Sequence, residues 1–159
     1  MTTVSKTTKM EIASPEAVDS PDGRLLFWLH QAHHTMRAEV LREFKKAGHD
    51  ITAEQWTILT FLWQRKEATQ VEIANKTGRD RPAISRLIDS LERRQLVKRK
   101  QLDRRTNKIV LSEQGIELHK LLLPIFSDLM NRLSAKISEQ NLEATADALM
   151  LITQSLKAD

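Results

Sequence analysis

A tight turn between two short helices restricts how the middle of this chain can fold. Thr69 and Glu72 stand three residues apart, which is the spacing of a capping box that opens a helix. The segment QVEIANKT follows this box and ends at Gly78. Glycine readily adopts the left-handed conformation that ends many helices, so the pattern predicts a short helix that stops at Gly78.

A second helix is predicted almost immediately after that turn. Asp80 is a suitable N-cap, and Pro82 would lie in the first turn, where its missing N–H costs nothing. The predicted helix runs from Asp80 to Arg94. Two short helices joined by a tight glycine turn predict a helix-turn-helix. Ser85 and Arg86 would project from the early turns of the second helix, the part that enters a DNA major groove.

Positive charge is concentrated in the same part of the chain. Residues 79–108 contain eleven Arg or Lys and four Asp or Glu, a balance of +7, whereas the whole chain carries +4. The remainder therefore sums to −3, and the basicity is local. This distribution is typical of a nucleic-acid binder, although charge alone fits a solvated basic face equally well.

The hydrophobic period changes from 3.6 to 2 after Gln95, which predicts two short strands. The strands are separated by the segment DRRT, so Arg104 and Arg105 would occupy the tip of a β-hairpin. A basic hairpin beside a basic helix is a wing. We expect it to contact phosphates or to insert arginine into the adjoining minor groove.

Amphipathic helices are predicted on both sides of this region. Apolar residues at helical spacing indicate one helix over residues 22–48 and two helices within residues 113–157. These helices have more apolar surface than one small domain needs, so we expect them to form a dimerisation region. Residues 1–21 are rich in Ser and Thr without apolar periodicity and are expected to be a mobile tail.

Composition excludes several classes of protein. The chain has no Cys, so disulfides, thiolate metal sites and thiol redox sensing are ruled out, and a reducing compartment is expected. No apolar run approaches the roughly 18 residues that span a bilayer, which predicts a cytoplasmic protein with no membrane association. No nucleophile motif, glycine-rich phosphate loop or paired-carboxylate pattern is present. We therefore expect neither an enzyme nor a bound cofactor.

The order of predicted elements, together with the wing, resembles the MarR family of bacterial winged helix-turn-helix regulators. The family's wing has Asp, any residue, Arg, five residues, Leu, and then Thr or Ser. Asp103, Arg105, Leu111 and Ser112 match this pattern position for position. The run RPAISRLIDSLERRQLVKR is also similar to the family's passage from recognition helix to wing. The likeness extends over about residues 22–157.

The resemblance implies a mainly α, α+β winged-helix fold with one domain over residues 22–159. In that domain, residues 51–112 would form the DNA-binding lobe, between dimerisation helices. The family implies a homodimeric repressor that binds a pseudo-palindromic operator in double-stranded DNA and is released by a small aromatic or anionic effector. It also implies that Arg105 reaches the minor groove and that Asp103 orients it.

The residues predicted to contact DNA combine the helix-turn-helix, the wing and the family pattern. They are Lys76, Arg79, Arg81, Pro82, Ser85, Arg86, Asp103, Arg104, Arg105 and Lys108. A weaker set consists of cations that either contact phosphates or merely keep a sheet edge soluble. This set is Arg93, Arg94, Lys98, Arg99 and Lys100. The family commonly ends its recognition helix with Gly where this chain has Gln95, so a less tightly turned exit is expected.

Aromatic residues leave further alternatives open. Trp28, His33, Trp56 and His119 are candidates for lining an effector pocket, although core packing is the commoner role of tryptophan. No metal site is predicted as the first choice. His30 and His34 lie on one face of a helix, however, so a metal-responsive regulator is one alternative. Another alternative is a helical protein-interaction module whose basic wing binds an acidic partner.

Overall fold

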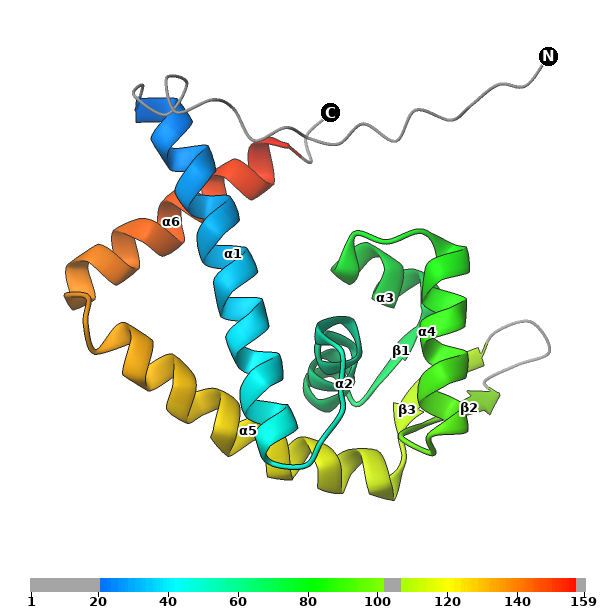
Figure 1. Ribbon diagram of the computed structural model, residues 1–159. Coiled ribbons are helices and arrows are strands. Elements are labelled where there is room, and N and C mark those ends of the chain that lie inside the picture. Colours follow the sequence, from blue (N-terminus) through cyan, green and yellow to red (C-terminus); the bar gives the residue numbers. More distant parts are fainter. Residues whose placement is uncertain (1–20, 102–106, 157–159) are drawn as a thin grey trace, which may run out of the picture. The chain divides into compact units, whose positions relative to one another are not determined.

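The computed structural model of the chain describes residues 21–101 and 107–156 (Figure 1). In chain order the elements are α1 (Pro21–Lys46), α2 (Ala53–Arg65), β1 (Glu67–Thr69), α3 (Gln70–Thr77), α4 (Arg81–Arg93), β2 (Val97–Gln101), β3 (Asn107–Leu111), α5 (Glu113–Ser134) and α6 (Glu139–Ser155). This is the mainly helical winged-helix fold that the sequence predicted. The tail predicted for residues 1–21 lies outside the described residues except for Pro21, with which α1 begins.

The chain divides into two compact units, Met1–Glu39 and Val40–Asp159. Helix α1 runs through the division, and its last turns belong to the larger unit, where Val40 and Phe44 are buried in the core. The proposed subdivision of residues 22–159 into a lobe and dimerisation helices is not tested by this division and stays a prediction.

Local hydrogen bonds explain where the helices of the larger unit begin. The Thr69 hydroxyl accepts from the backbone N–H of Glu72, and the Glu72 carboxylate accepts from the backbone N–H of Thr69 at 2.7 Å, so the predicted capping box is confirmed. The Asp80 carboxylate likewise accepts from the N–H of Ala83 at 2.7 Å. The remaining N-caps of this unit are Thr52, Ser112 and Ser138. Each cap satisfies a backbone donor that would otherwise lack a helical partner.

The sheet has three antiparallel strands in the order β1-β3-β2. The sequence predicted the β2–β3 hairpin but not β1, which is three residues long and lies between α2 and α3. Strand β1 pairs Ala68 with Ile109 of β3, and both side chains are buried. This third strand attaches the base of the wing to the helix-turn-helix.

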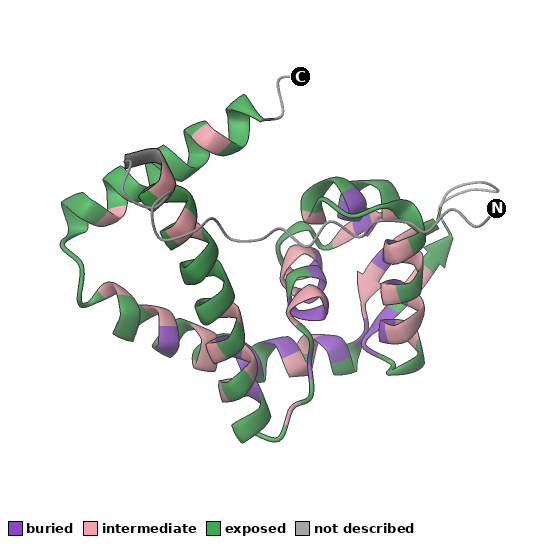
Figure 2. Cartoon of the chain, turned by 45° about the horizontal axis from the view of Figure 1, so that its top comes forward, coloured by how far each residue is buried: buried purple, intermediate pink, exposed green. Residues whose placement is uncertain are grey.

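The core of the larger unit lies between α2, α4, the sheet and the first half of α5. Figure 2 shows its buried residues on the inward faces of these elements. Helix α4 buries Ile84, Ile88 and Leu91 completely, at the three- and four-residue spacing of one helix face. The opposite face of α4 is therefore turned away from the core.

Helix α6 has no buried residue. Several large apolar side chains of α5, α6 and the residues next to these helices are exposed, namely Leu121, Leu123, Leu133, Ile137, Leu149, Met150, Leu151 and Leu156. Among the described helices, none is both long and apolar enough to cross a membrane.

Candidate nucleic-acid interface

Helix α4 presents a polar surface opposite its buried face. Arg81, Pro82 and Arg86 are exposed and Ser85 is half-buried, and all four lie in the first two turns. Neither Arg81 nor Arg86 has an ion-pair partner among the described residues. The helix thus offers two unneutralised guanidinium groups and one hydroxyl at the end where Asp80 caps it.

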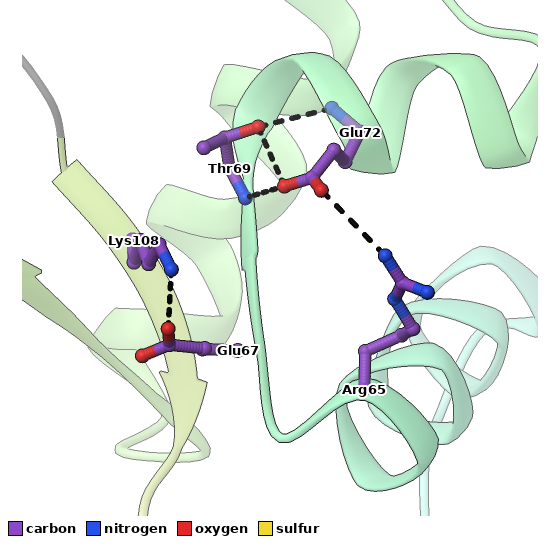
Figure 3. Close-up of polar contacts among 5 residues, drawn as sticks. All are labelled: Arg65, Glu67, Thr69, Glu72 and Lys108. Carbon is purple, nitrogen blue, oxygen red and sulfur yellow. Dashed lines mark hydrogen bonds and ion pairs between the residues drawn. The ribbon is translucent and has the colours of Figure 1, made fainter.

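Two other cations of the predicted DNA-contact set are engaged by carboxylates instead. A guanidinium nitrogen of Arg79 lies 2.7 Å from a carboxylate oxygen of Glu54 on α2. Lys108 on β3 forms an ion pair with Glu67 on β1 (Figure 3). The hydrogen bond from Lys108 lowers the pKa of Glu67, which holds that carboxylate in its charged form. A phosphate would have to compete with these acids for Arg79 and Lys108.

The same view shows the capping box of α3 (Figure 3). The backbone N–H and the hydroxyl of Thr69 both lower the pKa of Glu72. The second carboxylate oxygen of Glu72 lies 3.8 Å from Arg65 at the end of α2. Lys76, one turn further along α3, is exposed and forms no ion pair with a described residue.

The predicted wing tip lies outside the described residues. Asp103, Arg104 and Arg105 fall in the segment 102–106, between β2 and β3. The strands that lead to and from the tip are paired from Val97 with Leu111 to Gln101 with Asn107. The predicted hairpin is therefore present up to the tip, while the roles of the three tip residues stay predictions.

The exit from α4 is tightly turned, contrary to the expectation drawn from Gln95. The N–H of Gln95 donates to the carbonyl of Glu92, and the N–H of Leu96 donates to that of Leu91 at 2.9 Å, which is a Schellman motif. Gln95 adopts the left-handed conformation at φ +58° that the motif requires, although it is not a glycine. The expectation was wrong because the tertiary contacts at this corner impose the turn on a residue that does not favour it.

Those contacts come from the start of α5. The Ser112 hydroxyl donates to the carbonyl of Gln95, and the Ser112 N–H donates to that of Leu96 at 3.1 Å. Gly115 packs so closely that a Cβ built on it would lie 1.9 Å from the Leu96 carbonyl oxygen. The corner after α4 is thus held directly against α5. An open pocket of about 340 Å³ adjoins this corner, lined by Glu92, Gln95, Val97, Lys98, Ser112, Glu113 and Gln114.

Arg99 has a role that the sequence reasoning missed. It lies on β2, and its guanidinium donates to Asp89 at 2.5 Å and also to Glu92, both on α4. The sequence predicts for Arg99 either a phosphate contact or a role in keeping a sheet edge soluble, and the structure adds that its side chain is held by two carboxylates. The period-2 pattern did indicate that Arg99 points inward, because it shares its strand face with the buried Val97.

Gln55 makes a similar connection between α2 and α4. Its side-chain carbonyl accepts from the backbone N–H of Thr52 within the capping box and also from the guanidinium of Arg94 at 3.0 Å. Its amide nitrogen lies 3.4 Å from the Ser90 hydroxyl. Gln55 is buried, and through it the start of α2 is hydrogen-bonded to the last turn of α4.

The four candidate effector-pocket residues are not gathered into one site within either unit. Trp28 is 64% exposed and His33 is exposed, and both belong to the smaller unit. Trp56 and His119 are buried in the core of the larger unit, with their rings stacked at 5.0 Å between centroids. The structure gives Trp56 the commoner role of a core residue, and an effector pocket stays a prediction.

The metal-binding alternative finds little support in the geometry. The rings of His30 and His34 are neighbours on α1, with centroids 6.4 Å apart. Within residues 21–101 and 107–156, no three or more His, Cys, Asp or Glu side chains are grouped so that they could hold a metal ion. Two histidines alone leave most of a metal's coordination sphere unfilled.

Comparisons with known proteins agree with this architecture. Residues 51–106 match the profile of the MarR family. An uncharacterized HTH-type transcriptional regulator of Bacillus cereus is 32% identical over 121 residues, which cover 70% of this chain and 81% of that protein. A Bacillus anthracis protein described in the same words is 31% identical with the same coverage.

Solved structures of similar fold include regulators of the same family. The crystal structure of the Staphylococcus aureus MepR–DNA complex has a TM-score of 0.74 and 29% identity, covering 82% of this chain and 96% of that one. AbsC, a MarR family transcriptional regulator from Streptomyces coelicolor, has a TM-score of 0.77 over 88% of this chain and 97% of its own, and at 20% identity it supports the fold alone. The chain therefore belongs to the MarR family of DNA-binding winged helix-turn-helix transcriptional regulators, which are not enzymes.

Proposed function

We propose that this protein is a repressor that binds a pseudo-palindromic operator as a homodimer. Each protomer places α4 in a major groove and its wing in the adjoining minor groove. The observation that carries the proposal is the outer surface of α4, where Arg81 and Arg86 have no ion-pair partner among the described residues. Unneutralised arginines on a helix whose other face is fully buried are suited to contact phosphates and base edges.

The proposed contacts differ in what they contribute. Arg86 and Ser85 read base edges, because they lie in the second turn of α4 on its outer surface. Lys76 and Arg81 contact phosphates and add affinity that depends on salt concentration. The wing residues Asp103, Arg104 and Arg105 are included because of the family pattern. Pro82 lies at the start of α4, where it would be next to the DNA backbone. Arg79 and Lys108 contribute only where DNA displaces Glu54 and Glu67 from them.

The homodimer is supported by helix α6. A 17-residue helix with no buried residue gains little from tertiary packing, which supplies most of the stability of helices in proteins. The exposed leucines of α5 and α6 form an apolar surface that a second copy of the chain can cover. The two DNA-binding lobes of such a dimer would contact half-sites about one helical turn apart, roughly 10 base pairs.

Release by a small aromatic or anionic effector completes the proposal, and what supports it is membership of the family. Such a ligand can release DNA only by binding the DNA-free conformation more tightly than the DNA-bound one. The regulator would act in the cytoplasm, where it meets its operator.

The first test is selection of bound DNA from a random pool with the full chain. A pseudo-palindrome with two half-sites is the expected product, and repeating the binding with candidate aromatic acids tests release. A protein-interaction module with a basic wing would instead bind an acidic partner and leave no footprint on any DNA.

The different roles proposed for Arg86 and Lys76 predict different effects when each is substituted. Arg86→Ala should weaken operator binding by about 1–3 kcal/mol and relax the preference at one base position, because a side chain that reads a base edge is lost. Lys76→Ala should weaken binding to all sequences alike and reduce the salt slope by about 1, because only a phosphate contact is lost. Titrations of the selected operator and of scrambled DNA at several salt concentrations measure both effects. A uniform loss for both variants would show that Arg86 does not read bases.

A further inference from the structure

The contact that most directly joins the wing to the recognition helix is made by Arg99. Its two terminal nitrogens reach two different carboxylates, those of Asp89 at 2.5 Å and of Glu92. The two acids stand three residues apart on α4, so both lie on the side of the helix that meets β2. A planar guanidinium with fixed donor directions resists rotation when it is held at two points.

The direction of Arg99 follows from the pairing of the sheet. It stands opposite Ile109, which is fully buried, and on the same strand face as Val97. Its neighbours Lys98 and Lys100 alternate to the other face and are exposed. Arg99 therefore points toward α4, whereas the lysines beside it point to solvent.

The position of Arg99 along β2 determines where its contact attaches the strand to α4. Strand β2 leaves α4 through the tight turn at Gln95 and is paired along its length with β3, which is itself held by β1. Arg99 is four residues beyond that turn and three residues before the segment 102–106, for which the wing tip is predicted. Pairing within the sheet does not itself join β2 to α4, so Arg99 supplies a polar attachment to that helix beyond the turn.

The contact also changes the charge that DNA would meet. Asp89 is half-buried and lies one turn after Arg86, next to the outer surface of α4. An unpaired carboxylate at that place would repel phosphates, and Arg99 neutralises it. Because Arg99, Asp89 and Glu92 all keep 28–44% of their side-chain surface exposed, the ion pairs themselves add little to folding stability.

We propose that Arg99 is a positioning residue that holds the wing at a fixed angle to α4, so that both reach one operator half-site together. This inference rests on the proposed DNA-binding function. It assigns Arg99 no contact with DNA.

Removing the acids tests the proposal, because two explanations predict opposite changes in operator affinity. The double variant Asp89→Asn with Glu92→Gln makes the DNA-binding lobe more positive, so simple phosphate attraction predicts tighter binding. Loss of the clamp predicts weaker operator binding instead, by about tenfold or more, as expected when one set of specific contacts is lost. Arg99→Lys keeps the charge but not the two-pronged geometry and should show a similar loss. The matched control Lys98→Gln removes a neighbouring charge from the other strand face and should have a smaller effect.

The readouts are operator affinity, melting temperature and footprints of each groove. In the Arg99→Lys and the double variant, minor-groove protection beside each half-site should disappear, while guanine protection in the major groove and the melting temperature remain near those of the parent protein. Tighter operator binding by the double variant would overturn the proposal. Full minor-groove protection in Arg99→Lys would overturn it as well. A loss of protection in both grooves together with a lowered melting temperature would also overturn it, since Arg99 would then only support the fold. If the parent protein selects no DNA at all, it is the proposed function that fails.

Discussion

At the scale of single residues, Gln95 is held in a conformation that its side chain opposes. A left-handed φ of +58° crowds the Cβ against the backbone in every residue except glycine. The strain is retained because the Schellman hydrogen bonds and the Ser112 hydroxyl, which donates to the Gln95 carbonyl, define the corner together.

Gln95→Gly should therefore raise the free energy of unfolding. Removing the Cβ relieves about 1–2 kcal/mol of strain, while the greater freedom of glycine in the unfolded chain offsets about 0.5–1 kcal/mol, so a net gain of up to about 1.5 kcal/mol is expected. Urea unfolding measures the change. Gln95→Ala keeps the strain and serves as the control; if both variants changed stability equally, the side chain rather than the backbone would be responsible.

His119 is the other residue in an unusual setting. It is 1% exposed, and its ring is stacked between those of Trp56 and Trp63, at centroid distances of 5.0 and 4.7 Å. Neither of its ring nitrogens has a hydrogen-bond partner among the described residues. Burial lowers the pKa of His119 below its ordinary value of 6.5, because the charged form loses its hydration.

This lowered pKa predicts how stability depends on pH. The unfolded chain binds a proton at His119 more readily than the folded protein does, so the stability present above the unfolded pKa of about 6.5 is lost as the pH falls toward the folded value. His119→Phe keeps an aromatic ring in the stack without a titrating group and should flatten this loss. Urea unfolding at pH 7.5 and pH 5.5 gives the comparison, with His33→Gln, a substitution of an exposed histidine, as control. An unchanged pH dependence in His119→Phe would contradict the role given to burial.

At the scale of elements, the helices were predictable and one strand was not. Capping boxes and N-caps act over three residues, so Thr69, Asp80 and their partners indicated the starts of α3 and α4 from local sequence. The strand predicted after the segment DRRT is present as β3, Asn107–Leu111. Strand β1 has only three residues and exists because it pairs with β3, some forty residues later in the chain. No periodicity can be read in so short a segment.

At the scale of the whole molecule, the larger unit leaves apolar surface that its own fold does not cover. None of α6 is buried, and Leu149, Met150 and Leu151 form an exposed apolar run in its second half. The smaller unit likewise exposes Leu26 and Trp28 on α1. Water contact with so much apolar surface is unfavourable, and this supports the proposed second copy of the chain.

Leu149→Glu should therefore convert the protein to monomers, because a carboxylate would have to be buried in the proposed interface. Sedimentation velocity measures the mass. Gln154→Glu adds the same charge at an exposed polar position of α6 and should leave the mass unchanged. A dimer that persisted in Leu149→Glu would place the interface elsewhere.

The amino-acid sequence by itself determined the winged helix-turn-helix and the place of its recognition helix, because caps, glycine turns and apolar periods act between residues a few positions apart. Which cations remain unneutralised was decided only by the tertiary structure. Arg79 meets Glu54 from 25 residues earlier, Lys108 meets Glu67 from 41 residues earlier, and Arg99 reaches back ten residues to Asp89. Ion pairs depend on distances in space, and only folding brings these charges together.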